Sequence, residues 1–129
     1  MSQRDLFEFF MGGGFERGEG RSRPVWHPPT DVYEVEGGAV IILEVAGMAG
    51  GEFNLIVQDR TLVITGHRYG TDEKLSYRQM EIHYGEFRSE IEFPWPVDVD
   101  SIETSYSDGF FRVLLKRSKP RRIPVRSLD

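Results

Sequence analysis

The residue types that carry catalysis or bind metal ions are few and scattered in this chain. Its three histidines are His27, His67 and His83, and it has no cysteine. The histidines lack the short spacing of metal ligands, and the serines fall in predicted turns and strands without a nucleophile motif. The many carboxylates are typical of solvated sheet faces. We therefore predict a protein that is not an enzyme and that has no metal site.

The glycine run Gly12-Gly13-Gly14 invites comparison with a phosphate-binding loop. It lacks the Gly-Lys-Ser/Thr ending whose lysine and hydroxyl contact the phosphates and their magnesium ion. We expect no nucleotide and no other cofactor.

A short apolar peptide, Ile123-Pro124-Val125, stands close to the C-terminal end behind a charged linker. Proline fixes an extended backbone, so Ile123 and Val125 project to one side with little ordering entropy left to lose. This is the geometry of a peptide that docks in a groove. The alternative is a tail that binds nothing.

The net charge of −5 is unevenly distributed. From Asp31 to Asp108 there are 16 acidic residues against five basic ones, a local balance of −11, whereas Arg112 to Arg126 holds seven basic residues and no acidic one. The acidic body would repel phosphate groups, so we expect no nucleic-acid partner. The basic end is then either a solvating tail or a segment steered to the acidic body of another chain.

The clearest structural signal is a hairpin from Ser101 to Lys116. Ile102, Thr104 and Tyr106 alternate on one face, Ser107-Asp108-Gly109 supplies a turn, and alternation resumes afterwards. The second strand is nearly apolar on both faces, so its sheet should pack against a second sheet or a partner.

The rest of the body also reads as short strands. Ala39 to Val45 is a β-branched run suited to a strand covered on both faces, Phe53 to Ile64 forms another hairpin, and Glu86 to Phe93 alternates regularly. No longer stretch has a helical period, so we predict an all-β fold of seven or eight strands arranged as a sandwich. The predicted domain spans residues 26–117, between an N-terminal arm at 1–25 and a C-terminal tail at 118–129.

The arm is rich in phenylalanine, with four of the nine in its first fifteen residues, Phe7, Phe9, Phe10 and Phe15. The arm is too short and too glycine-rich to fold alone. It is either tucked onto its own domain or is an adhesive segment that meets partners and unfolded chains.

The stretch from His67 to Tyr84 is long for a connection within a compact domain. Within it a short strand is possible over six residues, Leu75, Ser76, Tyr77, Arg78, Gln79 and Met80. Such a strand would have an unpaired edge that another subunit could complete.

The composition also indicates the cellular compartment of the protein and whether it spans a membrane. No apolar run approaches the roughly 20 residues that cross a bilayer, and Asp5 and Glu8 interrupt the only apolar N-terminal stretch. With no cysteine and no leader, a cytoplasmic protein without a membrane span is expected.

Taken together, five motifs resemble the small heat shock protein family, whose α-crystallin domain is an immunoglobulin-like sandwich. In chain order they are Trp26-x-Pro28-Pro29-x-Asp31-x-Tyr33-Glu34, Leu62-x-Ile64-x-Gly66-x-Arg68, Glu81-x-x-x-Gly85-x-Phe87 leading to Phe93-Pro94, Asp108-Gly109-x-Phe111, and Ile123-Pro124-Val125. The resemblance implies an ATP-independent chaperone that holds partly unfolded proteins, built from dimers that assemble further through C-terminal tails. The long loop is similar to the bacterial and plant pattern, in which a loop strand is exchanged between two subunits.

The resemblance also indicates candidate sites. The tail would occupy a groove that we place at Leu55 and Val57 on one strand and at Ile102 and Tyr106 on another. Unfolding client proteins would meet this groove and the four arm phenylalanines once heat or stress loosens the assembly.

Four positions depart from the family pattern. Ala46 stands where a proline is usual, Thr104 replaces an alanine and Phe111 replaces a leucine. Ser89 occupies the place of a usual arginine, so the inter-strand ion pair made by that arginine is not expected here. Arg88 points to the opposite face of the strand and cannot substitute.

Two other functions fit a sandwich of this size. A co-chaperone module would dock on a folded chaperone, although that family normally lacks an Ile-Pro-Val peptide. A purely structural oligomer would assemble without affecting the aggregation of other proteins.

Overall fold

Seven β-strands make up the regular structure of the part of the chain that the structure describes. The computed structural model describes residues 24–71 and 73–127, and the four arm phenylalanines lie outside these ranges. The strands are β1 (Thr30–Val35), β2 (Gly38–Glu44), β3 (Glu52–Gln58), β4 (Thr61–Arg68), β5 (Gly85–Glu92), β6 (Val97–Ser107) and β7 (Phe110–Arg117). The prediction of an all-β fold is confirmed.

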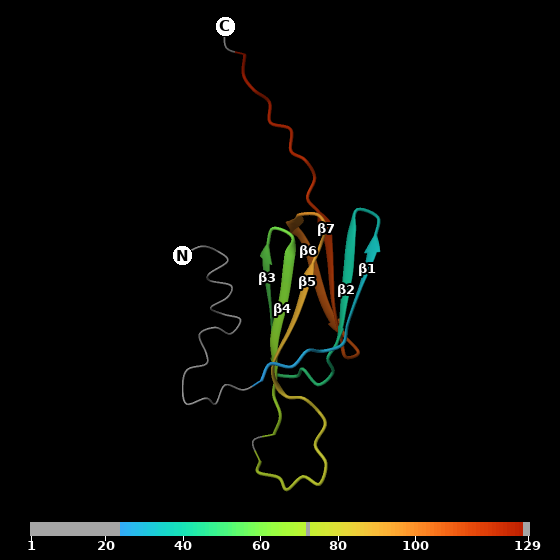
Figure 1. The fold of residues 1–129 in the computed structure, drawn as a ribbon, viewed down its shortest axis with the longest axis vertical. Helices are drawn as coiled ribbons and strands as arrows, with labels where there is room; N and C mark the ends of the chain where they lie inside the picture. The colour runs from blue at the N-terminus through green and yellow to red at the C-terminus, as the bar shows by residue number, and fades with distance from the viewer. Residues whose placement is uncertain (1–23, 72, 128–129) are drawn as a thin grey trace.

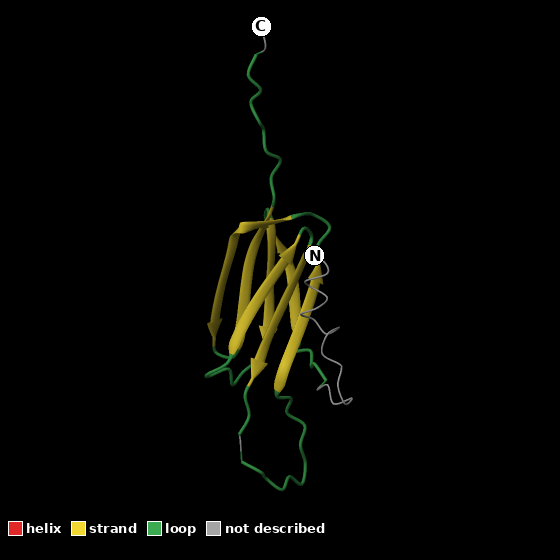
Figure 2. Cartoon of the chain, turned by 90° about the vertical axis from the view of Figure 1, so that its left-hand side faces the viewer, coloured by secondary structure: helices red, strands yellow, loops and turns green. Residues whose placement is uncertain are grey.

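The strands form two antiparallel sheets packed as a sandwich (Figure 1, Figure 2). One sheet has the order β1-β2-β7-β6 and the other β3-β4-β5. The long loop between β4 and β5 leaves one end of the sandwich, and the tail after β7 leaves the opposite end (Figure 1).

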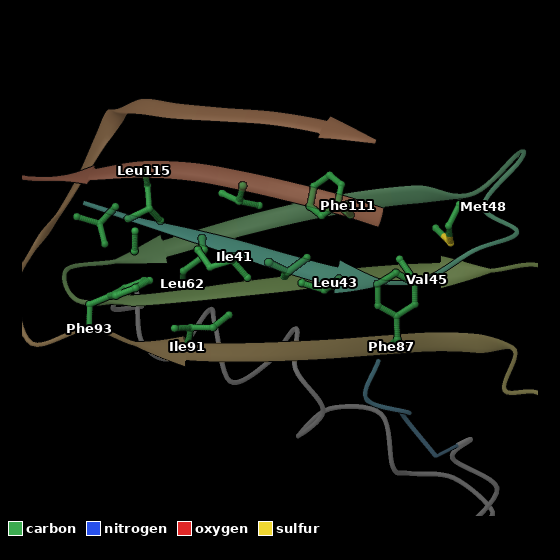
Figure 3. Packing of buried hydrophobic residues seen from close by; sticks show 14 residues of the cluster. Ile41, Leu43, Val45, Met48, Leu62, Phe87, Ile91, Phe93, Phe111 and Leu115 are labelled. Atoms are coloured by element: carbon green, nitrogen blue, oxygen red, sulfur yellow. The ribbon is translucent and has the colours of Figure 1, made fainter. Parts of the chain in front are cut away.

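The core lies between the sheets and is formed by alternating side chains (Figure 3). In β5 the inward residues Phe87 and Ile91 are buried, as the alternation of this segment predicted. The aromatic rings of Phe53 from β3 and Phe111 from β7 stack with centroids 3.9 Å apart and so join the two sheets. Other fully buried side chains come from both layers: Ile41, Leu43, Leu62, Ile64, Val113 and Leu115.

The hairpin from β6 to β7 closes at Asp108 and Gly109, as the sequence predicted. Both residues have positive φ, 54° and 84°. This left-handed backbone matches the twist of the flanking strands in a two-residue turn, and Asp and Gly tolerate it better than most residues.

One strand prediction needs correction, and a second stays a prediction. In β2 the inward Ala39 and Ile41 are fully buried, but Val40 and Ile42 on the opposite face are only half-buried. In the single chain only one face of β2 is therefore fully buried, because the second sheet packs against that face alone. Residues 75–80 form no strand in the single chain, since an extended segment needs a neighbouring strand for its hydrogen bonds.

Candidate interaction surfaces

The predicted groove residues lie on the side of the sandwich where β3 and β6 are the outer strands of their sheets. Leu55 and Val57 share the inward face of β3 with Phe53, and both are half-buried against the core. Ile102 of β6 packs against the same core. The structure thus brings these predicted residues to one side of the sandwich, which we call the open side because β3 and β6 are the outermost described strands there.

Tyr106 is the polar member of this group. Its ring lies 5.7 Å from that of Phe53, centroid to centroid, and its hydroxyl donates a hydrogen bond of 2.9 Å to the Val45 carbonyl oxygen. The residue is nevertheless 41 % exposed. It therefore offers a fixed aromatic surface between β3 and β6.

A large bulge interrupts β6 beside this side, a feature that the sequence analysis missed. The pairing with β7 shifts between Asp98 and Glu103. The Asp98 carboxylate accepts a hydrogen bond from the Asp100 amide, and the Ser101 hydroxyl donates to the Asp98 carbonyl and accepts from the Lys116 amide. Bulges of this kind disrupt the ladder of an edge strand and limit its pairing with other chains.

The tail peptide is fully open in the single chain. The side chains of Ile123 and Val125 are 76 % and 85 % exposed, and no strand forms at residues 118–127. An aliphatic pair on a proline-stiffened segment is costly to leave in water.

The long loop also presents apolar side chains to solvent. Their exposed fractions lie between 42 % and 62 % for the six residues Tyr69, Leu75, Tyr77, Met80, Ile82 and Tyr84. So many exposed large side chains in one segment are typical of a contact surface.

The four outer strands differ in how far their edges are covered or interrupted. β5 is partly covered, because the Trp26 backbone exchanges hydrogen bonds with Glu86 and Arg88. The edge of β6 is interrupted by the bulge between Asp98 and Glu103. β3 borders the open side that holds Leu55. By contrast, β1 is regular along Thr30–Val35 and exposes Val32, Tyr33 and Val35.

A second feature that the sequence analysis did not identify is a junction at the base of the long loop. The Arg68 guanidinium donates hydrogen bonds to the carbonyl oxygens of His83 and Ala46, and its carbon lies 4.4 Å from the centre of the Trp26 ring and 5.4 Å from that of Tyr84. Only the Gly66-x-Arg68 spacing could be recognised from the sequence, because the partners of Arg68 are distant in the chain.

Among the described residues, no group of three or more acidic residues and histidines is arranged to hold a metal ion. That part of the chain also has no helix long and apolar enough to cross a membrane. The surfaces described above are apolar and exposed, and they suit contacts with other polypeptides.

The described residues thus form a two-sheet antiparallel β-sandwich with half-buried apolar residues on β3 and β6 and an exposed apolar tail. The family model described as the Hsp20/alpha crystallin family matches residues 31–129. The chain belongs to this family of small heat shock proteins, which are chaperones rather than enzymes.

Relatives occur in plants and bacteria. The chain is 31 % identical over 112 residues to the 17.0 kDa class II heat shock protein of Zea mays, a match that covers 84 % of this chain and 73 % of the maize protein. It is 24 % identical over 104 residues to small heat shock protein C2 of Rickettsia felis, covering 77 % of this chain and 68 % of that protein.

Solved structures share the fold. A small heat shock protein from Xylella fastidiosa superposes with a TM-score of 0.62 at 24 % identity, covering 81 % of this chain and 100 % of that one. The hspA protein of Xanthomonas axonopodis gives 0.63 at 20 % identity over 73 % of this chain and 96 % of that one. The α-crystallin sandwich predicted from the five motifs is therefore confirmed.

Proposed function

We propose that this protein is an ATP-independent holdase, which binds partly unfolded proteins and prevents their aggregation. The holdase itself is proposed to work as an oligomer built from dimers. The observation that carries the proposal is the combination of an exposed aliphatic tail peptide with a half-buried apolar strip on β3 and β6. Both apolar surfaces would be buried away from water if the tail of one chain occupied the groove of another. Holding unfolded chains in this way needs no catalytic group.

The dimer is proposed to form through the long loop. Residues 75–80 of one subunit would become a strand by pairing with the free β1 edge of a second subunit. The apolar side chains of the loop, such as Leu75 and Tyr77, would then lie near Val32 and Tyr33, which are exposed on β1. This pairing removes an unpaired strand edge and apolar surface from water together.

Higher assembly is proposed to use the tail. Burial of Ile123 and Val125 is favourable by about 1.5–3 kcal/mol each before ordering costs, which makes a single contact weak. Several such contacts within one assembly become strong through effective concentration, while each still exchanges. A reversible oligomer of this kind can uncover apolar surface when heat loosens it.

Clients are proposed to bind at the surfaces that this exchange uncovers. The groove residues Leu55, Val57, Ile102 and Tyr106 are one surface, and the arm phenylalanines Phe7, Phe9, Phe10 and Phe15 are the other. We place this activity in the cytoplasm, on the absence of cysteine from the sequence.

The direct test is light scattering of a heat-sensitive protein warmed with and without the full chain, in buffer free of nucleotide. Suppressed aggregation near equal molar ratios is the expected result. A chain lacking residues 1–15 should protect less well, and full protection by it would remove the arm from the client site. Unchanged aggregation at all ratios would overturn the holdase and leave a structural oligomer or a module that docks on a folded chaperone.

A further inference from the structure

Arg68 is the last residue of β4 and lies where the long loop begins. Three of its N–H groups are directed at two carbonyl oxygens. Nε donates to His83 at 2.9 Å, Nη2 donates to the same oxygen, and Nη1 donates to Ala46 at 3.0 Å. The guanidinium thereby joins both stems of the loop to the segment that follows β2.

Aromatic rings hold this guanidinium from the sides. Trp26 lies 4.4 Å away and also stacks on the His83 ring at 5.5 Å between centroids. The Trp26 indole N–H donates to the Gly85 carbonyl oxygen at 3.3 Å, and the Trp26 and Phe87 rings pack in a T-shaped arrangement with centroids 5.3 Å apart. Figure 1 shows the chain after residue 23 crossing at this place, where β4 and β5 meet the loop.

The two stems of the loop are also fitted to each other. A Cβ atom at Gly70 would lie 3.2 Å from the Tyr84 ring, which is tighter than ordinary packing, so the ring occupies the space that the glycine leaves open. Gly85 has a φ of +92°, a backbone conformation that side-chain-bearing residues rarely adopt. The exit direction of the loop is therefore set by Arg68, Trp26, Gly70 and Tyr84 together.

We propose that Arg68 is the positioning residue for dimerisation, because it fixes the direction in which the loop leaves its own subunit and so presents residues 75–80 to a second copy of this chain. This inference rests on the proposed exchange of the loop. Without Arg68 the loop would sample many directions, and that conformational entropy would be lost at each association. Trp26 ties the start of the predicted domain, directly after the N-terminal arm, into the same junction.

The test is Arg68→Lys, which keeps the charge but cannot make the forked pair of hydrogen bonds or the planar stack. It is introduced into the full chain together with Ile123→Ala and Val125→Ala, and the monomer–dimer equilibrium is followed by sedimentation over a dilution series. We expect the dimer Kd to rise by about tenfold or more, as for the loss of one or two charged hydrogen bonds. Trypsin cleavage after Lys74 and Arg78, measured in the chain with its natural tail, should also become faster.

Two controls separate positioning from general stability. Arg112→Lys makes the same chemical change at an exposed site on β7 and should leave the Kd and the cleavage rate unchanged. Val113→Ala weakens the buried core and should lower the thermal midpoint without raising the Kd. An Arg68→Lys chain that dimerises and is cleaved like the parent would overturn the inference.

A chain with residues 73–82 replaced by a Gly-Ser linker of equal length tests the underlying exchange. If this chain is monomeric while Arg68→Lys dimerises normally, the loop makes the dimer and only the role of Arg68 is wrong. If the linker chain dimerises as tightly as the parent, the loop exchange itself is wrong, and the inference about Arg68 fails with it.

Discussion

The hydroxyl oxygens of Thr30 and Ser89 lie 2.9 Å apart and join β1 of one sheet to β5 of the other. Thr30 also donates a hydrogen bond of 2.9 Å to the Pro28 carbonyl oxygen. A hydroxyl has a single hydrogen, so Ser89 must be the donor to Thr30. A chain of two hydrogen bonds thus stands where the family pattern places an arginine.

This arrangement predicts that Ser89→Ala lowers the free energy of unfolding by about 1 kcal/mol, the usual net value of one hydrogen bond. Thr30→Val should cost more, because it removes both hydrogen bonds and leaves the Pro28 carbonyl without this donor. Chemical denaturation of dimeric samples at one protein concentration measures both. Ser105→Ala, at an exposed site on β6, is the matched control. Equal stability of Ser89→Ala and the parent would show that the Thr30 contact contributes nothing.

The strands were predictable because their signals are local. Phe87 and Ile91 alternate with charged residues, and Asp108-Gly109 is a turn signal that needs no knowledge of distant residues. Family membership was predictable from motif order. Leu55 and Ile102 lie on the same side of the sandwich because β3 and β6 are outer strands there, an arrangement that the period of a single strand does not reveal.

Contacts between distant residues were not predictable from these patterns. Thr30 and Ser89 are 59 positions apart, and Arg68 bonds backbone carbonyls that any residue could supply. The β6 bulge depends on a serine hydroxyl that replaces a backbone partner. Residues 75–80 show a further limit, since the strand proposed there would form only when a second chain pairs with it.

Phe111 occupies a position where the family pattern has leucine, and its ring stacks on Phe53 at an interplanar angle of 5°. Aromatic pairs contribute about 0.5–1.5 kcal/mol beyond their buried area. We therefore expect Phe111→Leu to lower the free energy of unfolding by about 1–2 kcal/mol. A double-mutant cycle with Phe53→Leu, followed by thermal denaturation, should give a coupling energy near the aromatic-pair value. Additive effects of the two changes would contradict a specific role for the stack.

Gly66 lies on β4 where the Phe87 ring crosses the strand. A Cβ atom there would fall within 2.6 Å of the Glu52 carbonyl oxygen and would collide with the ring. Gly66→Ala should therefore destabilise the sandwich by about 3 kcal/mol or more, at or above the usual cost of overpacking. Gly37→Ala is the control, because its φ of +76° costs only about 1–2 kcal/mol and its Cβ would meet open space. Comparable midpoints for the two variants in urea would argue against the close packing of Phe87.

The tail peptide gives the prediction that bears most directly on assembly. Ile123→Ala with Val125→Ala removes five apolar carbon groups, worth roughly 4 kcal/mol if both side chains are buried in a partner groove. That loss weakens each tail contact by nearly three orders of magnitude, so the assembly should fall toward dimers. Multi-angle light scattering measures the mass. Arg121→Lys with Arg122→Lys keeps the charge and the apolar pair and should preserve the large species. An unchanged mass in the double alanine variant would mean that the exposed pair is not the anchor, and the groove at Leu55 and Ile102 would then need another occupant.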